Sequence, residues 1–147
     1  MSNVPGLRSP YVKVGRLVYF GRMLDKIRLN ANGRLPTGYN LGNKVYTWFD
    51  ARCTRFLAIN YEALVERVSA GGSDDEILQW CFKHGRRPSE EDIEIWNEFM
   101  MKRGWRDSSS AALAEAKRLR GFAQRDDVQT AFEFHLADES SDEAPPQ

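Results

Sequence analysis

The residues best suited to chemistry lie close together near the N-terminus, in the stretch FGRMLDKIRLNA (residues 20–31). Its apolar residues recur at helical spacing, so we expect a helix there. Four charged side chains are interspersed among them: Arg22, Asp25, Lys26 and Arg28. Apolar residues fall on two sides of this helix, which is typical of a helix packed on two sides. The four charges should therefore be partly removed from water and need partners.

One acid in this stretch cannot neutralise three cations. Asp25 can reach Arg22 or Arg28 at a spacing of three residues, but Lys26 also requires a negative charge. The sequence therefore predicts an additional anion, either a carboxylate from the acidic second half of the chain or a bound ligand. In the second case Arg22 and Lys26 would hold an anionic group, and Asp25 would orient them or act as a base.

Asn97 is a second polar residue in an apolar setting. It lies in the apolar sector of a predicted helix over residues 90–103, beside Trp96. A buried amide must find hydrogen-bond partners, and a Lys or Arg from helix 20–31 would suit its carbonyl. We expect an interior polar network that fixes how two helices dock. The alternative is a pocket for a small anion or substrate, with Tyr39 on its rim.

The cysteines and histidines predict no metal site. Cys81 and His84 are three residues apart on one helix, but Cys53 and His135 would complete four ligands only by coincidence of folding. His84 suits a helix C-terminus, where a cation is favourable, and we interpret His135 as a core residue. No motif indicates a cofactor, because the GYNLGN loop lacks the strand–loop–helix context of a phosphate site.

Charge is distributed unevenly along the chain. Residues 1–60 contain ten Lys/Arg and two Asp/Glu, whereas residues 61–147 contain eleven and nineteen, so a net charge of zero conceals halves of +8 and −8. A basic half can bind phosphate on a nucleic acid or a small ligand. We favour mutual neutralisation of the halves, because the opposing charge already lies in the same chain. Nucleic-acid binding is less expected, since no known RNA-binding pattern is present.

Helix start and stop signals divide the chain after residue 45. Most predicted helices begin at an oxygen-bearing side chain and end at a glycine. Thr47 with Asp50 resembles a capping box, and Ser73 with Glu76 has the standard spacing. The remaining helices are expected to start at Asn60, at Ser89 with Asp92, in the serine run 108–110, and at Asp126 or Asp127. The predicted helices after residue 45 span residues 48–59, 61–70, 74–84, 90–103, 111–120 and 128–137.

Outside these helices the sequence predicts irregular structure. Residues 34–46 read as a loop, and the acidic tail 138–147 is expected to be disordered. No run alternates as a strand would, so the fold class is all-α. We expect one compact domain of six or seven short helices over residues 9–137, with residues 1–8 as an N-terminal extension and an irregular segment before helix 20–31.

Three motifs together carry a family resemblance: FGRMLDKIRLNANGRLPTGYN, WNEFMMKRGWRD and RDDVQTAFEFHLADE. They resemble an uncharacterised bacterial family, domain of unknown function 5069, over about residues 9–139. The family pattern R-M-x-D-K-x-R matches the charged stretch 20–31, and Asn97 lies in the second motif. This chain departs from the pattern at Gly21, where members often have proline, and near His135. The family has no assigned activity, so the resemblance supports the architecture and leaves the function open.

Three hypotheses for the function follow. The leading one is a small soluble helical protein that acts by binding a partner through a surface or groove bordered by helix 20–31. The alternative is an anionic-ligand-binding domain or an enzyme of unknown reaction that uses Arg22, Asp25, Lys26 and Asn97. The third is weak nucleic-acid binding by the basic half. The sequence has neither an apolar run of about 20 residues nor a signal-peptide core, so we expect a cytoplasmic protein without membrane segments.

Overall fold

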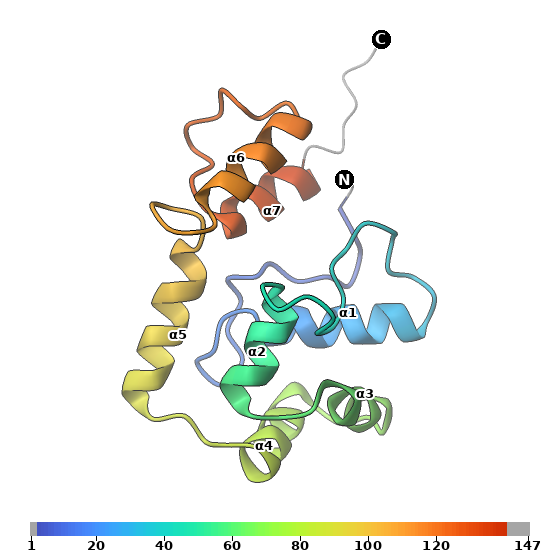
Figure 1. Cartoon of the computed structure of the whole chain (residues 1–147). Helices are drawn as coiled ribbons and strands as arrows, with labels where there is room; N and C mark the ends of the chain where they lie inside the picture. Colours follow the sequence, from blue (N-terminus) through green and yellow to red (C-terminus); the bar gives the residue numbers. More distant parts are fainter. Residues whose placement is uncertain (1–2, 141–147) are drawn as a thin grey trace. The chain divides into compact units, whose positions relative to one another are not determined.

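The computed structural model describes residues 3–140 and confirms the all-α fold class. Seven helices follow an irregular N-terminal segment, and no strand forms among the described residues (Figure 1). The helices are α1 (Phe20–Ala31), α2 (Phe49–Leu57), α3 (Tyr61–Ser69), α4 (Asp74–His84), α5 (Glu90–Lys102), α6 (Ser110–Leu119) and α7 (Ala131–Ser140).

The chain divides into two compact units. The larger unit is Gly6–Trp96, and the smaller comprises Met1–Pro5 and Asn97–Gln147, of which residues 3–5 and 97–140 are described. Helix α5 begins in the larger unit and ends in the smaller. The domain boundaries expected after residues 8 and 137 stay predictions.

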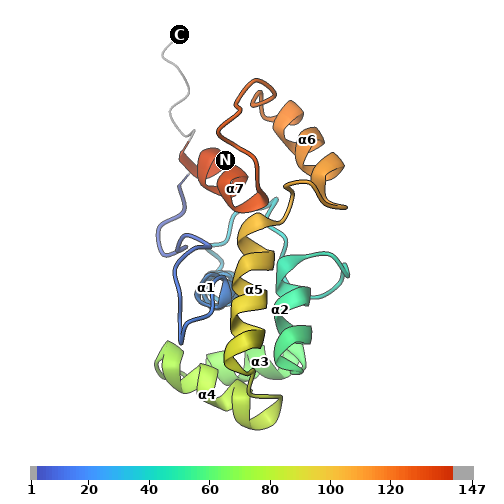
Figure 2. The ribbon, with the colours of Figure 1, turned by 90° about the vertical axis from the view of Figure 1, so that its left-hand side faces the viewer.

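In the larger unit α1 packs against α3, and α3 packs against α4. Figure 2 views α1 nearly along its axis, with α3 and α4 on one side of it. Met23 and Leu24 of α1, Leu64 of α3 and Ile77 and Leu78 of α4 are each at most 1% exposed. Burying one such side chain stabilises a fold by about 1.5–3 kcal/mol, so these residues hold α1 in place.

The segment before α1 folds as a tight turn without forming a strand. Val14 and Leu17 exchange backbone hydrogen bonds of 3.0 and 2.9 Å as an isolated antiparallel bridge. Gly15 at the tip has a φ of +52°, and a Cβ built there would lie 2.2 Å from Leu78 Cδ2. Only glycine fits this turn, both for its conformation and for its closeness to α4.

Several predicted helix starts are confirmed. The Asn60 side chain accepts a hydrogen bond from the backbone N–H of Ala63 and caps α3. Ser73 and Glu76 form a complete capping box at α4. At α5 the Ser89 hydroxyl accepts from the N–H of Asp92 at 3.1 Å, and the Asp92 carboxylate accepts from the N–H of Ser89 at 2.9 Å. Each cap satisfies donors that the first helical turn leaves unpaired.

The capping box predicted for Thr47 and Asp50 is wrong. Helix α2 starts at Phe49, its N-cap is Trp48, and the N-cap side chain makes no capping hydrogen bond. The carboxylate of Asp50 turns instead into the protein, where it accepts other hydrogen bonds. Buried donors bind this carboxylate, because leaving a buried donor unpaired costs the full loss of its hydration.

The predicted start of the last helix is also wrong. Helix α7 begins at Ala131, not after Asp126 or Asp127. The Thr130 hydroxyl accepts from the N–H of Glu133 at 3.2 Å, and the Glu133 carboxylate accepts from the N–H of Gln129 at 2.9 Å. Thr130 and Glu133 thus have the sequence spacing of a capping box, and their side chains mark the true start.

Asp127 makes a different contact: its carboxylate accepts hydrogen bonds from Arg125 at 3.1 and 2.7 Å.

In the smaller unit α6 packs against α7. Phe122, Val128 and Ala137 form its buried cluster, with Phe134 packed against it.

His135 was expected in the core, and that prediction is wrong, since the residue is only partly buried. Leu136, the next residue along the chain, is 37% exposed. Asp138–Ser140, the start of the predicted disordered tail, continue α7 instead, and the rest of that tail lies outside the described residues. No described helix is long and apolar enough to cross a membrane.

Candidate functional site

The charged residues of α1 are sheltered, as the sequence predicts. Arg22, Asp25 and Lys26 are 3%, 7% and 4% exposed, and the Arg28 side chain is 34% exposed. Lys26 belongs to one group of polar residues, and Asp25 and Arg28 belong to a second. We call Tyr19, Lys26 and Asp50 the buried cluster, and Arg8, Asp25, Arg28 and Asp74 the rim cluster.

Lys26 is the centre of the buried cluster. Its Nζ donates hydrogen bonds to the Tyr19 hydroxyl and to the backbone carbonyl of Asn40, both at 2.7 Å. It also lies 2.7 Å from Asp50 Oδ1. An ammonium group has three protons, and these three acceptors account for all of them.

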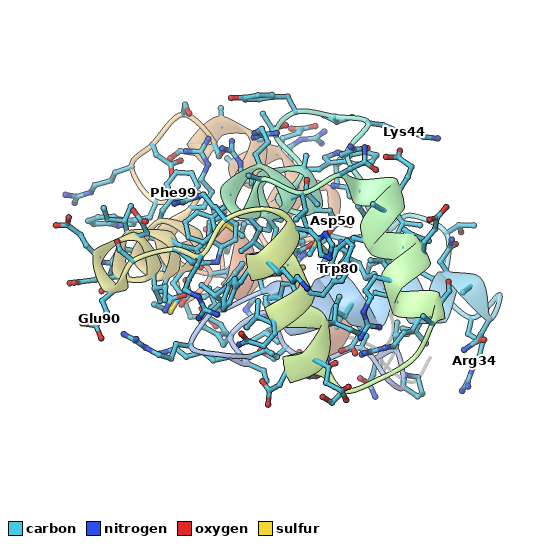
Figure 3. All side chains as sticks on the ribbon, turned by 90° about the horizontal axis from the view of Figure 1, so that it is seen from below. Arg34, Lys44, Asp50, Trp80, Glu90 and Phe99 are labelled. Carbon is cyan, nitrogen blue, oxygen red and sulfur yellow. The ribbon has the colours of Figure 1, made fainter. Side chains whose placement is uncertain are left out.

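Asp50 completes the cluster from the first turn of α2. Its Oδ1 accepts a hydrogen bond of 2.5 Å from the Tyr19 hydroxyl, and its Oδ2 accepts one of 2.8 Å from the N–H of Gly42. The residue is 1% exposed and lies in the interior, whereas Lys44 projects outward (Figure 3). The anion that Lys26 requires is therefore a carboxylate from the basic half of the chain, not from the acidic half.

Tyr19 occupies a strained position immediately before α1. Its φ is 73°, in the left-handed region that non-glycine residues seldom adopt. Its N–H donates to the carbonyl of Pro10 at 2.9 Å, and its ring packs edge-on against Phe49 with centroids 5.5 Å apart. Such backbone strain amounts to about 1–3 kcal/mol, so the contacts of the Tyr19 side chain must offset it.

Burial dominates the acid–base properties of this region. It raises the pKa of Tyr19, and the nearby Asp50 carboxylate raises it further. Burial also lowers the pKa of Lys26, although Asp50 acts in the opposite direction. Burial and the same carboxylate raise the pKa of Cys53 well above its ordinary value. The phenol and the thiol therefore keep their protons at neutral pH, which does not suit either of them to act as a nucleophile.

Arg8 is the main cation of the rim cluster. Its Nε and Nη2 donate to the two carboxylate oxygens of Asp25 at 2.8 and 3.0 Å, and its backbone N–H adds a bond of 2.9 Å. Its Nη1 donates to Asp74 at 2.6 Å, and Nη2 also donates to the carbonyl of Gly21 at 3.1 Å. The N-terminal segment is thereby fastened to α1 and to the start of α4.

Asp74 links the rim cluster to α4. Its second oxygen lies 2.8 Å from Arg28 Nη2, while Arg28 Nη1 is 3.8 Å from Asp25. Burial alone would raise the pKa of Asp74, but hydrogen bonds from Arg8 and Arg28 outweigh it and lower the pKa below 3.8. This carboxylate comes from the acidic half of the chain, as the charge asymmetry suggested. Arg22 donates from Nη1 to the backbone carbonyl of Arg8 at 3.0 Å.

Sequence reasoning missed four residues of these clusters: Tyr19, Arg8, Asp50 and Asp74. One signal was available for Asp50. The first sixty residues contain only two acids, Asp25 and Asp50, against ten cations, so Asp50 was the one other acid of the basic half that could pair with a cation of α1. No comparable signal marks Tyr19 or Arg8, because irregular backbone brings them to the site.

Three predicted site residues lie outside both clusters: Tyr39, Asn97 and Arg22, which bonds to the carbonyl of Arg8. Tyr39 is partly buried in the loop, next to Asn40, whose carbonyl binds Lys26. Asn97 is on α5, in the smaller unit, and is 9% exposed. Its burial was expected, and its pairing with a cation of α1 stays a prediction.

The cysteines and histidines lie in different surroundings. Cys53 and Cys81 are buried free thiols, whereas His84 is exposed and its ring lies 4.9 Å from that of Trp80. Within residues 3–140 no three His, Cys, Asp or Glu side chains are grouped as metal ligands would be.

Comparison with known proteins supports the resemblance drawn from the motifs. A search of curated proteins finds no match. The model of one family, described as a domain of unknown function (DUF5069), matches residues 4–141, and so covers nearly the whole chain and both units. This match includes α1 with both charged clusters. The chain belongs to the DUF5069 family.

Proposed function

We propose that this protein acts by binding a partner protein, and that the charged residues of α1 form a framework that shapes the binding surface. The observation that carries the proposal is the saturation of Lys26. All three ammonium protons have acceptors within the protein at 2.7 Å, so none remains for a substrate or ligand.

The framework holds two irregular segments in place. The buried cluster forms hydrogen bonds with loop 34–46 at two points, the carbonyl of Asn40 and the N–H of Gly42. The rim cluster holds the N-terminal segment through the hydrogen bonds that Arg8 donates to Asp25 and Asp74. Loops positioned on a rigid scaffold are common binding elements, and a loop already in its bound conformation loses little entropy when a partner docks.

The competing proposal is an anionic ligand or substrate held by Arg22, Asp25, Lys26 and Arg28, with Tyr39 and Asn97 at its edge. A thermal-shift series with inorganic phosphate, nucleotides and small carboxylates at constant ionic strength separates the two. A ligand at one hundred times its Kd stabilises a protein by about 2.7 kcal/mol, which a melting curve readily detects. The framework proposal predicts no saturable rise in Tm.

A saturable rise in Tm that is lost in Arg22→Lys but kept in Lys13→Met would overturn the framework proposal. Arg22→Lys preserves the charge and removes the planar set of guanidinium donors, and Lys13, which is exposed, serves as a control for charge alone. Arg22→Ala is expected to lower the stability and the affinity for a partner together, without measurable turnover. Full stability in Arg22→Ala would also count against the framework.

A further inference from the structure

One part of the surface next to the framework combines exposed apolar side chains with cations. Val45 and Tyr46 are 42% and 70% exposed on adjacent positions before α2. The Arg55 guanidinium stacks on the Tyr46 ring, with its carbon 3.7 Å from the ring centroid. Lys44 precedes this pair and projects outward from the protein (Figure 3). We call Lys44, Val45, Tyr46 and Arg55 the loop–α2 face.

The backbone of this face is held in position. Arg52 Nε donates to the carbonyl of Thr47 at 3.3 Å, and Trp48 donates its N–H to the carbonyl of Val45 at 3.1 Å. Gly42, whose φ is +89°, bonds to Asp50 just before the face begins. The face is therefore attached to α2 at one end and to the buried cluster at the other, so little flexibility is lost on binding.

Charge on this face points to an acidic partner. Between residues 26 and 61 the only carboxylate belongs to Asp50, which is buried and bonded to Lys26, Tyr19 and Gly42. No described carboxylate forms an ion pair with Lys44 or Arg55. A guanidinium stacked on a ring keeps its N–H groups in the plane, where they can still bind a carboxylate side by side.

We infer that the loop–α2 face binds an acidic segment of a partner protein. In the complex, an apolar side chain of the partner packs against Tyr46, and carboxylates on either side of it form ion pairs with Arg55 and Lys44. This inference rests on the proposed binding function and names its surface. Tyrosine and arginine are the residue types most often found at binding hot spots. A phosphodiester backbone is a poorer fit, because tracking it requires a longer row of cations and open stacking platforms.

The test is fluorescence anisotropy of the full chain with a labelled peptide of alternating glutamate and leucine. Saturable binding that weakens as salt rises is expected. Tyr46→Ala and Arg55→Glu should each weaken it about tenfold or more. Arg87→Glu is the matched control, because Arg87 is also exposed and stacks on Phe82 with its guanidinium carbon 4.7 Å from the ring centroid. It should change the affinity by less than about twofold, within the range of a remote charge.

Three results would overturn the inference: no saturable binding of the peptide, equal losses in all three variants, or tighter binding of a labelled oligothymidylate through the same two residues. Melting curves of each variant establish that it is folded. Failure here leaves the framework proposal standing, because that proposal is tested separately, by the anion series and by the stability of Arg22→Ala.

Discussion

The buried cluster and the rim cluster share one helix and both pair cations with carboxylates, yet they differ in their access to water. In the buried cluster the side chains of Lys26 and Asp50 are 5% and 0% exposed. In the rim cluster those of Arg8 and Asp74 are 29% and 25% exposed. Both pairs have short contacts, 2.7 Å in the first and 2.6 Å in the second. Distance alone therefore does not distinguish them.

Exposure decides what each cluster contributes. A buried ion pair loses hydration that its attraction only partly restores, so its net contribution is small, but loss of one partner is severe. A partly exposed pair is weakened by solvent and salt, and water can replace a lost partner. The buried cluster is thus suited to enforce one conformation of loop 34–46, and the rim cluster to add modest stability.

The largest effect is expected from removing one member of the buried pair. Lys26→Met leaves the Asp50 carboxylate without its counterion, and Asp50→Asn does the same to the ammonium group. Each should lower the free energy of unfolding by about 3–5 kcal/mol, measured by urea denaturation. A loss below about 1 kcal/mol in both variants, typical of surface pairs, would erase the contrast between the clusters.

Tyr19→Phe should have the next largest effect. It keeps the ring and the strained backbone but removes the hydroxyl that binds Lys26 and Asp50. Two buried polar groups then lose a partner, and a loss of about 1–3 kcal/mol is expected. Tyr46→Phe, in which an exposed hydroxyl is removed, should change the stability by less than about 0.5 kcal/mol. Equal losses in the two variants would contradict the account.

Asp74→Asn in the rim cluster should lower stability by about 1 kcal/mol, and less at high salt. The pKa of Asp74 lies below its ordinary 3.8 in the folded protein, so the unfolded chain binds the proton more readily. Its contribution is present above about pH 4 and disappears as the pH falls through the folded pKa. Urea midpoints of both proteins between neutral pH and pH 3 should converge as the pH falls; a constant gap would contradict this assignment.

The smallest changes in stability are expected at two helix starts, Ser73 beside the rim cluster and Thr47 near the buried cluster. Ser73 caps α4 directly before Asp74, so Ser73→Ala should lower stability by about 1 kcal/mol. Thr47 stands before Asp50 but makes no cap at α2, so Thr47→Ala should fall within about 0.5 kcal/mol of the wild type. Thermal unfolding of both variants checks this. A larger loss of stability in Thr47→Ala would indicate that Thr47 caps α2 after all, and would contradict the account.

Much of the fold follows from local patterns. The apolar spacing of α1 and the caps at Asn60, Ser73 and Ser89 depend on neighbours within one helical turn, so sequence alone is enough to predict them. The capping box predicted for Thr47 and Asp50 is wrong because tertiary contacts of the Asp50 carboxylate outweigh a local hydrogen bond at the helix start. The carboxylate binds the other residues of the buried cluster instead, and residue spacing along the chain does not reveal such tertiary contacts.

The clusters were predictable in part. Counting cations against acids indicated that Lys26 and the arginines of α1 needed further anions, and the structure supplies Asp50 and Asp74. The identity of those anions, and the roles of Tyr19 and Arg8, depend on contacts between residues up to 66 positions apart. A left-handed turn at Tyr19 leaves no signature in the residue type, because tyrosine does not favour that conformation.

The central claim is that Lys26 and Asp50 are matched to each other inside the protein, not reserved for a ligand. A double-mutant cycle measures this directly, with Lys26→Met, Asp50→Leu and the combined variant unfolded in urea. We predict that the double variant is more stable than the sum of the single losses implies, by at least about 2 kcal/mol. Additivity within about 0.5 kcal/mol would show that the two charges act independently and would contradict the account.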